Sequence, residues 1–268
     1  MRLLFWNTHR NEKINKYIAG IALFYQIDVI VLAEYTADKN ELMTILGSEG
    51  KSYTWCNTIG CERVNICTVY EDIEPGVQDK YYSIQIIKNH FILVGTHLMS
   101  DLYGNHEDNR LERIRLAMKD IHDAETSIGS SRTIIMGDMN ESPYDKGCLS
   151  AHGFHGLPEL LENDNKSRIV DDIEYQKYYN PMWNLFGDKS YPPGTYYRSS
   201  SELYTPMWYM LDQIIIGADL LQSFNLEEFR IITSYGNVSL VDKGRHPDKT
   251  ISDHFPVMCE VIEENSRR

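Results

Sequence analysis

Six short apolar runs in this chain adjoin a side chain that can hold a divalent metal or polarise a phosphate group. The runs are rich in Ile, Val and Leu and are bounded by polar residues, as is typical of buried strands. A carboxylate, amide or imidazole at the end of a strand is held by the scaffold while it faces a cleft lined by loops. One such position would carry little weight, but six along one chain indicate a shared site. They are Asn7, Glu34, Thr96-His97, Gly137-Asp138-Met139-Asn140, Asp212 and Ser252-Asp253-His254.

The order of these motifs resembles that of the endonuclease/exonuclease/phosphatase (deoxyribonuclease I-like) superfamily. That family has an Asn on its first strand, a Glu on its second, a Thr-His pair, Gly-Asp-x-Asn, an Asp before an apolar strand and a terminal Ser-Asp-His. The same order runs from residue 7 to residue 254 here, so the resemblance covers nearly the whole chain. Gly-Asp-x-Asn and Ser-Asp-His are the specific motifs, whereas Asn7 and the Thr-His pair are informative only in their company.

The resemblance implies a four-layer α/β sandwich, in which two mixed β-sheets pack face to face and are flanked by helices. Alternating strand and helix patterns along the chain agree with this architecture. Because the motifs come from both ends of the sequence, we expect residues 1 to 268 to form a single domain.

Two helices are predicted around the first motifs. Apolar residues at helical spacing follow Asn11 up to residue 25, which predicts a capped amphipathic helix. Such a helix would link the strands of Asn7 and Glu34 in a parallel unit. The segment Asp38-Lys39-Asn40-Glu41 resembles a capping box that opens a second helix, and Gly47 is expected to close it.

The middle of the chain predicts antiparallel strands, a surface helix and long loops. Alternating segments over residues 53 to 98 favour antiparallel strands, and a charged periodic stretch over 107 to 125 favours a surface helix. Residues 141 to 210 are rich in Tyr, Pro, Gly and Asn, so we expect long ordered loops with a short helix near 158 to 163. Residues 263 to 268 are expected to be a frayed tail.

The metal expected at this site is Mg²⁺, a hard cation that prefers oxygen ligands and retains several waters. One or two carboxylates and a substrate phosphate therefore suffice to bind it. We expect Glu34 to be the main ligand, with Asp253 and Asn7 completing or supporting the site, and Mn²⁺ to be able to replace Mg²⁺. The alternative is that these strand-terminal acids simply pair with nearby bases.

Asp138 and Asn140 are the candidates for activating water. Their side chains stand at i and i+2, hence on the same side of an extended backbone. Asp138 can take a proton from an attacking water, and Asn140 can donate to the phosphate or orient that water. The alternative is that the two residues only end a strand and make a turn.

The resemblance also implies roles for two imidazoles. His254 would present a charged ring to the non-bridging phosphate oxygens, and Asp212, from another strand, would keep that ring charged and oriented. His97 would be a second imidazole that binds phosphate. The other seven histidines are interpreted as ordinary surface or core residues.

Substrate contacts are expected from basic and aromatic residues near these motifs. We select Arg198 and Arg113 as candidate phosphate contacts, although most arginines are merely solvated. Tyr197 and Trp208 belong to an aromatic cluster with Tyr196 and Tyr209 that either stacks on substrate or packs in loops.

The composition of the chain indicates in which cellular environment the protein is expected. No apolar stretch approaches the roughly 20 residues that span a bilayer, and the apolar part of the N-terminus is too short for a secretory signal. The five cysteines favour reduced thiols in a cytoplasm. Cys56, Cys61 and Cys67 lie close together, but no CxxC spacing and no fourth ligand supports a zinc site.

The expected function is Mg²⁺-dependent hydrolysis of a phosphate ester, most simply by a nuclease acting on phosphodiester bonds of DNA or RNA. The formal charge of −13 opposes binding of a polyanion and favours a phosphatase or phosphodiesterase acting on a small or lipid-linked phosphate. A catalytically silent binding module is the third alternative, against which the intact motifs argue. Nothing in the sequence predicts the oligomeric state.

Overall fold

The computed structural model describes residues 1–48, 50–87, 91–100, 106–159, 166–201, 203 and 205–262. Two large sheets pack against each other at its centre, and contacts of β1 and β2 with β7 and β8 join them. In order across the first sheet, the strands are β16 (Phe224–Ile231), β19 (Val257–Val261), β1 (Arg2–Asn7), β2 (Val29–Ala33), β4 (Val64–Thr68) and β3 (Thr54–Trp55).

The second sheet has seven strands and carries the Thr-His pair, the Gly-Asp-x-Asn motif and Asp212. Both large sheets are mixed, because β1–β2 and β7–β8 are parallel while most other pairs are antiparallel. In order, the strands of the second sheet are β5 (Ile73–Asp79), β6 (Tyr82–Ile87), β7 (Phe91–His97), β8 (Thr133–Asp138), β15 (Asp212–Gly217), β12 (Tyr178–Tyr179) and β9 (Gly156–Leu157).

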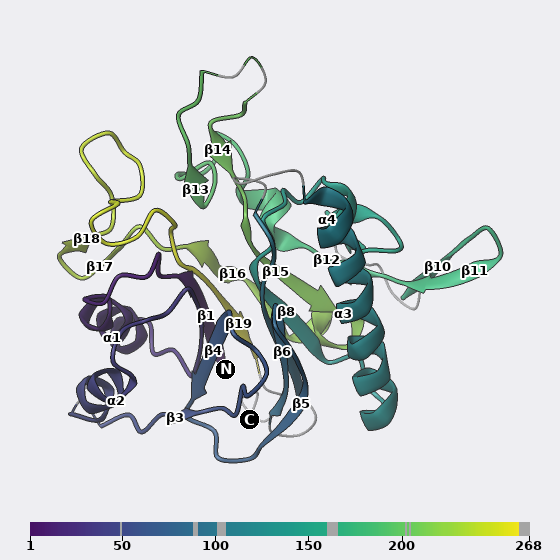
Figure 1. Cartoon of the computed structure of the whole chain (residues 1–268), viewed down its shortest axis with the longest axis horizontal. Helices are drawn as coiled ribbons and strands as arrows, with labels where there is room; N and C mark the ends of the chain where they lie inside the picture. Colours follow the sequence, from purple (N-terminus) through teal and green to yellow (C-terminus); the bar gives the residue numbers. More distant parts are fainter. Residues whose placement is uncertain are drawn as a thin grey trace.

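Helices cover the outer faces of both sheets. The helices α1 (Asn15–Phe24) and α2 (Lys39–Ser48) lie beside the first sheet, and α3 (Glu107–Ile128) lies along the second (Figure 1). The result is the predicted four-layer α/β sandwich. No helix in the described ranges combines the length and apolar character that a membrane span requires. That residues 1 to 268 form one domain stays a prediction.

Strand β8 shows why the central strands read as continuous apolar runs. Ile134 and Met136 belong to the core between the sheets, whereas Ile135 belongs to a second core beneath α3. All three side chains are completely buried. A strand buried on both faces has no polar alternation, so only its polar end can reach solvent or substrate.

The start of α1 differs from the prediction. The helix begins at Asn15 and has no side-chain cap. The side-chain oxygen of Asn11 accepts from the backbone N–H of Lys13 at 2.9 Å, before the helix begins, and its side-chain nitrogen donates to the main-chain oxygens of Thr250 and Ile251, at 3.2 and 2.8 Å. The predicted cap was therefore wrong, and the side chain ties the loop after β1 to the segment that precedes Asp253.

The capping box of α2 is half present. The side chain of Asp38 accepts from the backbone N–H of Asn40 at 2.8 Å, as a cap does. Glu41 does not reach back to Asp38, because it accepts from the amide of Asn15 at 2.6 Å and so links α2 to α1. Gly47 does not close the helix, which continues to Ser48.

The strands predicted over residues 53 to 98 are antiparallel, but they divide between the sheets. The pair β3–β4 joins the first sheet, and β5–β6–β7 form one side of the second. Helix α3 runs three residues further than predicted and ends at Gly129, whose φ is 68°.

The segment over residues 141 to 210 contains short elements rather than loops alone. The hairpin of β10 (Ser167–Val170) and β11 (Ile173–Gln176) projects from the body of the protein (Figure 1). The short helix predicted near 158 to 163 lies largely outside the described residues, as does the predicted tail over 263 to 268. Besides β9, β12 and this hairpin, the elements are α4 (Lys146–Leu149), η2 (Pro181–Leu185), β13 (Tyr196–Tyr197) and β14 (Trp208–Tyr209).

The approach of β7 to β8 depends on Gly137. A Cβ atom at this position would lie 2.0 Å from the main-chain oxygen of Thr96, its partner in the strand pairing. We expect Gly137→Ala to lower the free energy of unfolding by roughly 1–3 kcal/mol, because overpacking must push the two strands apart. Chemical denaturation measures this change.

The matched control is Gly47→Ala, where a Cβ would meet nothing within 4 Å in a helix. Because Ala suits a helix better than Gly, this change should leave stability unchanged or raise it by about 0.5–1 kcal/mol. Equal denaturation midpoints for the two variants would contradict the proposed strain at Gly137.

Candidate active site

Most of the predicted residues meet in one cleft of about 1010 Å³. Strand register explains part of this convergence. His97 pairs with Asp138 across β7 and β8, and Asp138 pairs with Asp212 across β8 and β15, so the three stand in a row. Asp212 is fully buried behind the cleft wall. The predicted residues that line the cleft are Asn7, Glu34, His97, Asp138, Asn140, Arg198, Asp253 and His254.

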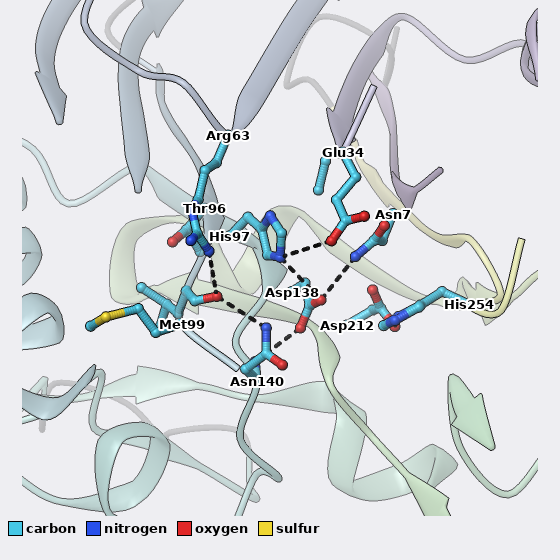
Figure 2. Close-up of polar contacts among 12 residues, drawn as sticks. Asn7, Glu34, Arg63, Thr96, His97, Met99, Asp138, Asn140, Asp212 and His254 are labelled. Carbon is cyan, nitrogen blue, oxygen red and sulfur yellow. Dashed lines mark hydrogen bonds and ion pairs between the residues drawn. The ribbon is translucent and has the colours of Figure 1, made fainter. Parts of the chain in front are cut away.

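Asp138 is at the centre of the polar contacts (Figure 2). Its side chain is nearly buried, and Oδ2 accepts from the amide of Asn7 at 3.0 Å. Oδ1 accepts from the backbone N–H of Asn140 at 2.9 Å, and His97 Nε2 lies 3.7 Å from Oδ2. A carboxylate fixed in this way faces the cleft as a proton acceptor with a defined orientation.

Asn140 is held with one of its polar atoms free. Its side-chain nitrogen donates to the main-chain oxygen of Leu98 at 3.0 Å, and Arg63 donates to the same oxygen at 3.3 Å (Figure 2). The amide oxygen makes no hydrogen bond to any described residue. The amide oxygen of Asn140 can therefore accept a hydrogen bond from a water. The second N–H of the same amide can donate one.

His254 and Asp212 form the pair that the resemblance implied. His254 Nδ1 lies 2.7 Å from Asp212 Oδ2, and both side chains are buried. Burial alone would lower the pKa of His254, but the charge and hydrogen bond of Asp212 outweigh it and raise that pKa to about 10. The imidazole is therefore charged at neutral pH. The ring of Tyr196 covers it, with centroids 4.8 Å apart.

His97 has the opposite character. Burial lowers its pKa, although the carboxylates of Asp138 and Glu34 oppose this shift. Its Nε2 atom lies 3.7 Å from oxygens of both carboxylates. His254 is thus charged and His97 neutral, and the two differ because His254, unlike His97, has a directly hydrogen-bonded acid.

The acidic end of the cleft carries the predicted metal ligands. Glu34 follows β2 and has a φ of 50°, a strained conformation for this residue type. Its carboxylate makes no hydrogen bond to any described residue, and the nearest side-chain nitrogens paired with it are Arg10 Nε at 3.5 Å and His97 Nε2 at 3.7 Å. Asp253 Oδ1 lies 3.1 Å from His9 Nδ1.

This donor set fits a hard divalent cation. Glu34 offers a carboxylate free of hydrogen bonds to the described residues, and Asn7 adds an amide oxygen that accepts only from the backbone of His9, at 3.1 Å. Another group of three, Asp138, Asp212 and His254, has ligand atoms within 4.8 Å of one another. There the charged ring of His254 is committed to Asp212, so a cation is better placed at Glu34.

Three of the predicted substrate contacts do not line the cleft. Tyr197 stacks on His246 with centroids 3.6 Å apart, and Trp208 stacks on Phe255 at 6.4 Å. Arg113 pairs with Asp79 at 3.0 Å. Packing and ion pairing thus occupy these side chains, while Arg198 lines the cleft with no side-chain partner among the described residues.

Some cleft residues were not predicted from the sequence. His9 and Arg10 line it, although His9 had been interpreted as an ordinary histidine. Both residues have positive φ, at 49° and 53°, which turns the chain back toward the site. Their position two and three residues after Asn7 was the available signal. Tyr144 also lines the cleft.

Residues 82–243 match the model of the Endonuclease/Exonuclease/phosphatase family. The chain belongs to this family. It is accordingly a metal-dependent hydrolase of phosphoesters, and the convergence of its motifs in one cleft agrees with that membership. A search of curated proteins found no match.

Solved structures of endonuclease/exonuclease/phosphatase proteins share the fold at low sequence identity. The 3′ phosphatase NExo from Neisseria, bound to product DNA hairpin, is 11% identical with a TM-score of 0.61, covering 98% of this chain and 100% of its own. Truncated Caenorhabditis elegans TDP2 is 14% identical, with a TM-score of 0.57 and coverage of 98% and 97%. The human Nocturnin catalytic domain with bound sulfate is 14% identical, with a TM-score of 0.56, and the match covers 97% of this chain and 92% of that domain.

The pair of Asp212 and His254 gives a prediction on pH. Because Asp212 is the main cause that raises the pKa of His254, Asp212→Asn should let burial lower that pKa, so the ring loses its proton at a lower pH. Turnover should fall, and the alkaline limb of the kcat/KM profile should move from near 10 toward neutral pH.

Asp123→Asn is the matched control, since Asp123 is exposed on α3, where it pairs with Lys119 outside the cleft. It should leave the profile unchanged. A loss of rate in Asp212→Asn with an unmoved alkaline limb would show that the proton on His254 is not the one that matters.

Proposed function

We propose that this hydrolase is a Mg²⁺-dependent nuclease that cleaves phosphodiester bonds in DNA or RNA. The observation that carries the proposal is the row of His97, Asp138 and Asp212, with His254 beside it, at the wall of an open cleft. A proton acceptor and a charged imidazole on either side of one space suit in-line attack of water on a phosphate.

Asp138 would take the proton of the attacking water. Its oxygens are oriented by Asn7 and by the backbone of Asn140. The free amide oxygen of Asn140 would accept from the same water and so fix its direction of attack.

His254 would donate to a non-bridging oxygen, where negative charge grows in the transition state. Neutral His97 would contribute a further contact to phosphate without adding a second full charge. Glu34, assisted by Asn7 and Asp253, would hold the cation, which neutralises charge on the phosphate when bound.

The principal rival is a phosphatase or phosphodiesterase acting on a small or lipid-linked phosphate. The net charge of −13 favours it, because long polyanions are repelled by an acidic protein. Two exposed guanidinium groups, those of Arg10 and Arg198, nevertheless line the cleft. Acidic residues line the same cleft (Glu34, Asp138, Glu141, Asp145 and Asp253), so these two arginines are the candidate contacts for a strand held at only a few phosphates.

A cytoplasmic location is part of the proposal. All five cysteines are free thiols, and four of them are buried. Among the described residues, no cluster of metal-ligating side chains includes a cysteine. Packing thus accounts for these thiols without a disulfide or zinc site.

The metal requirement is tested with Glu34→Gln. Chelator should abolish activity, and Mg²⁺ or Mn²⁺ should restore it. The variant should need a higher metal concentration, since an amide is a weaker ligand for a hard cation than a carboxylate. Direct Mn²⁺ binding, followed by electron paramagnetic resonance, should weaken in parallel.

Glu12→Gln is a suitable control, because Glu12 is exposed and does not line the cleft. Full activity of the unmodified protein in excess chelator would rule out the metal-dependent mechanism.

The substrate class is tested with plasmid, single-stranded DNA, RNA and a panel of phosphomonoesters at several salt concentrations. We expect cleavage of nucleic acid with a shallow salt dependence, as for about two or three phosphate contacts. Arg198→Ala should raise KM more than it lowers kcat, because its exposed side chain offers uniform binding.

Arg115→Ala, on the surface of α3 and paired with Glu112, serves as the charge control. Turnover of phosphomonoesters alone, with no cut in any polymer, would replace the nuclease assignment by the rival one.

A further inference from the structure

We propose that Tyr144 forms a stacking subsite for an unpaired nucleobase beside the reaction centre. This inference rests on the proposed nuclease function and adds a binding group for the base to the groups that handle the phosphate. It predicts that the enzyme prefers single strands or frayed ends, because only an unpaired base can expose its face to a protein ring.

Tyr144 lines the cleft and is exposed to solvent. Glu141, Ser142 and Pro143 are buried, and Tyr144, which follows them four residues after Asn140, is 45% exposed. A tight turn fixes the backbone here, since Ser142 N donates to Asp145 Oδ2 at 2.7 Å and Asp145 N donates to Ser142 O at 3.0 Å. Tyr144 is thus a half-exposed large side chain on a rigid turn at the cleft wall.

The ring is supported by two other aromatic side chains. Trp183 contacts it edge-on, with centroids 6.2 Å apart and planes at 64°, and Phe186 lies 5.9 Å away at 54°. Neither neighbour is stacked face to face on Tyr144. Such edge contacts hold a ring in place and leave face area open, and stacking on an aromatic face is how proteins bind single-stranded bases without strong sequence preference.

The position of Trp183 is fixed by the helix that carries it. Trp183 belongs to η2, whose first residues Pro181 and Met182 are buried. The side chain of Asn180 caps this helix by accepting from Met182 N at 3.0 Å. A platform built on fixed elements costs little conformational entropy when a ligand binds.

Other aromatic residues of the cleft are less suited to this role. Tyr196 is packed on His254 and close to Tyr209, with centroids 4.8 and 6.2 Å apart. These contacts use Tyr196 to cover the imidazole. Among the tyrosines of the described residues that line the cleft, Tyr144 alone is exposed, since Tyr196 and Tyr209 are half-buried.

Residues of the loop between β13 and β14 also line the cleft with Tyr144. They include Leu203 and Pro206. The combination of a flat ring, apolar side chains and the exposed guanidinium of Arg198 matches a nucleotide, which joins a flat apolar base to an anion.

The test compares two oligomers that differ only in the flatness of their bases. One is a short single strand of thymidines, and the other contains 5,6-dihydrothymidine, which keeps the polar edge of the base but has a puckered ring. Kinetics are measured for the unmodified protein and for Tyr144→Ala, Tyr144→Phe and Tyr175→Ala. Tyr175 is the matched control, a tyrosine of the β10–β11 hairpin that does not line the cleft.

We expect Tyr144→Ala to raise KM for the thymidine oligomer about tenfold, as loss of one stacked base implies, with a smaller change in kcat. The dihydrothymidine oligomer should bind poorly to the unmodified protein and show little further loss in this variant. Tyr144→Phe, which keeps the ring, and Tyr175→Ala should resemble the unmodified protein on both oligomers. Unchanged melting temperatures show that all variants are folded.

A second measurement uses 2-aminopurine in place of one base, because stacking on Tyr144 should quench its fluorescence in the unmodified protein and not in Tyr144→Ala. An active enzyme whose KM is the same in Tyr144→Ala, or changes equally for both oligomers, overturns the stacking subsite and leaves the nuclease function intact. Failure of the unmodified protein to cleave either oligomer, or any nucleic acid, overturns the nuclease function and the subsite with it.

Discussion

Two carboxylates, those of Asp138 and Asp212, stand directly opposite each other on neighbouring strands and are almost completely buried. Like charges in this arrangement repel, and burial removes the water that would screen them. The rest of the site can be understood as the answer to this repulsion. Asp212 is hydrogen-bonded to the charged ring of His254, and Asp138 accepts hydrogen bonds from the side chain of Asn7 and the backbone N–H of Asn140. The high pKa of His254 is a direct result, because its charge is what makes the buried acids tolerable.

Backbone strain gathers around the same place. Glu34 and Asn140 have positive φ, as do His9 and Arg10. Such conformations cost free energy and persist only where surrounding contacts determine them. Here the backbone N–H of Arg10 donates to the main-chain oxygen of Glu34 at 3.1 Å, and the hydroxyl of Thr8 contacts the same oxygen at 2.9 Å. The loops after β1 and β2 therefore hold each other, and the side chains they carry are fixed before any ligand arrives.

The sequence was informative where a residue's role follows from its place on a strand. Asp138 and Glu34 end buried apolar runs, and that pattern alone put them at the edge of a sheet. Position in three dimensions was harder to infer for Tyr197 and Arg113, because short-range sequence does not say which face of a loop or helix a side chain will occupy. Tyr144 was missed for the related reason that its exposure depends on a turn among buried neighbours.

The capping residues show a second limit of local patterns. Asn11 is well suited to cap a helix, and its side-chain oxygen accepts from the backbone N–H of Lys13 at 2.9 Å. Its side-chain nitrogen donates to the carbonyl groups of residues 250 and 251, at the far end of the chain, and the helix itself begins only at Asn15. The tertiary partner could not be seen in the sequence around residue 11, although the polar character that makes both contacts good was visible.

Strand β1 is inserted between β2, its near neighbour in sequence, and β19, which lies about 250 residues further along and pairs Leu3 with Cys259. The first sheet therefore cannot be completed until β19 has been synthesised. His254 and Asp253 immediately precede the strand that fills this gap. A chain truncated before β19 would carry the acids of the early strands without the imidazole that pairs with Asp212, so we expect it to lack hydrolytic activity.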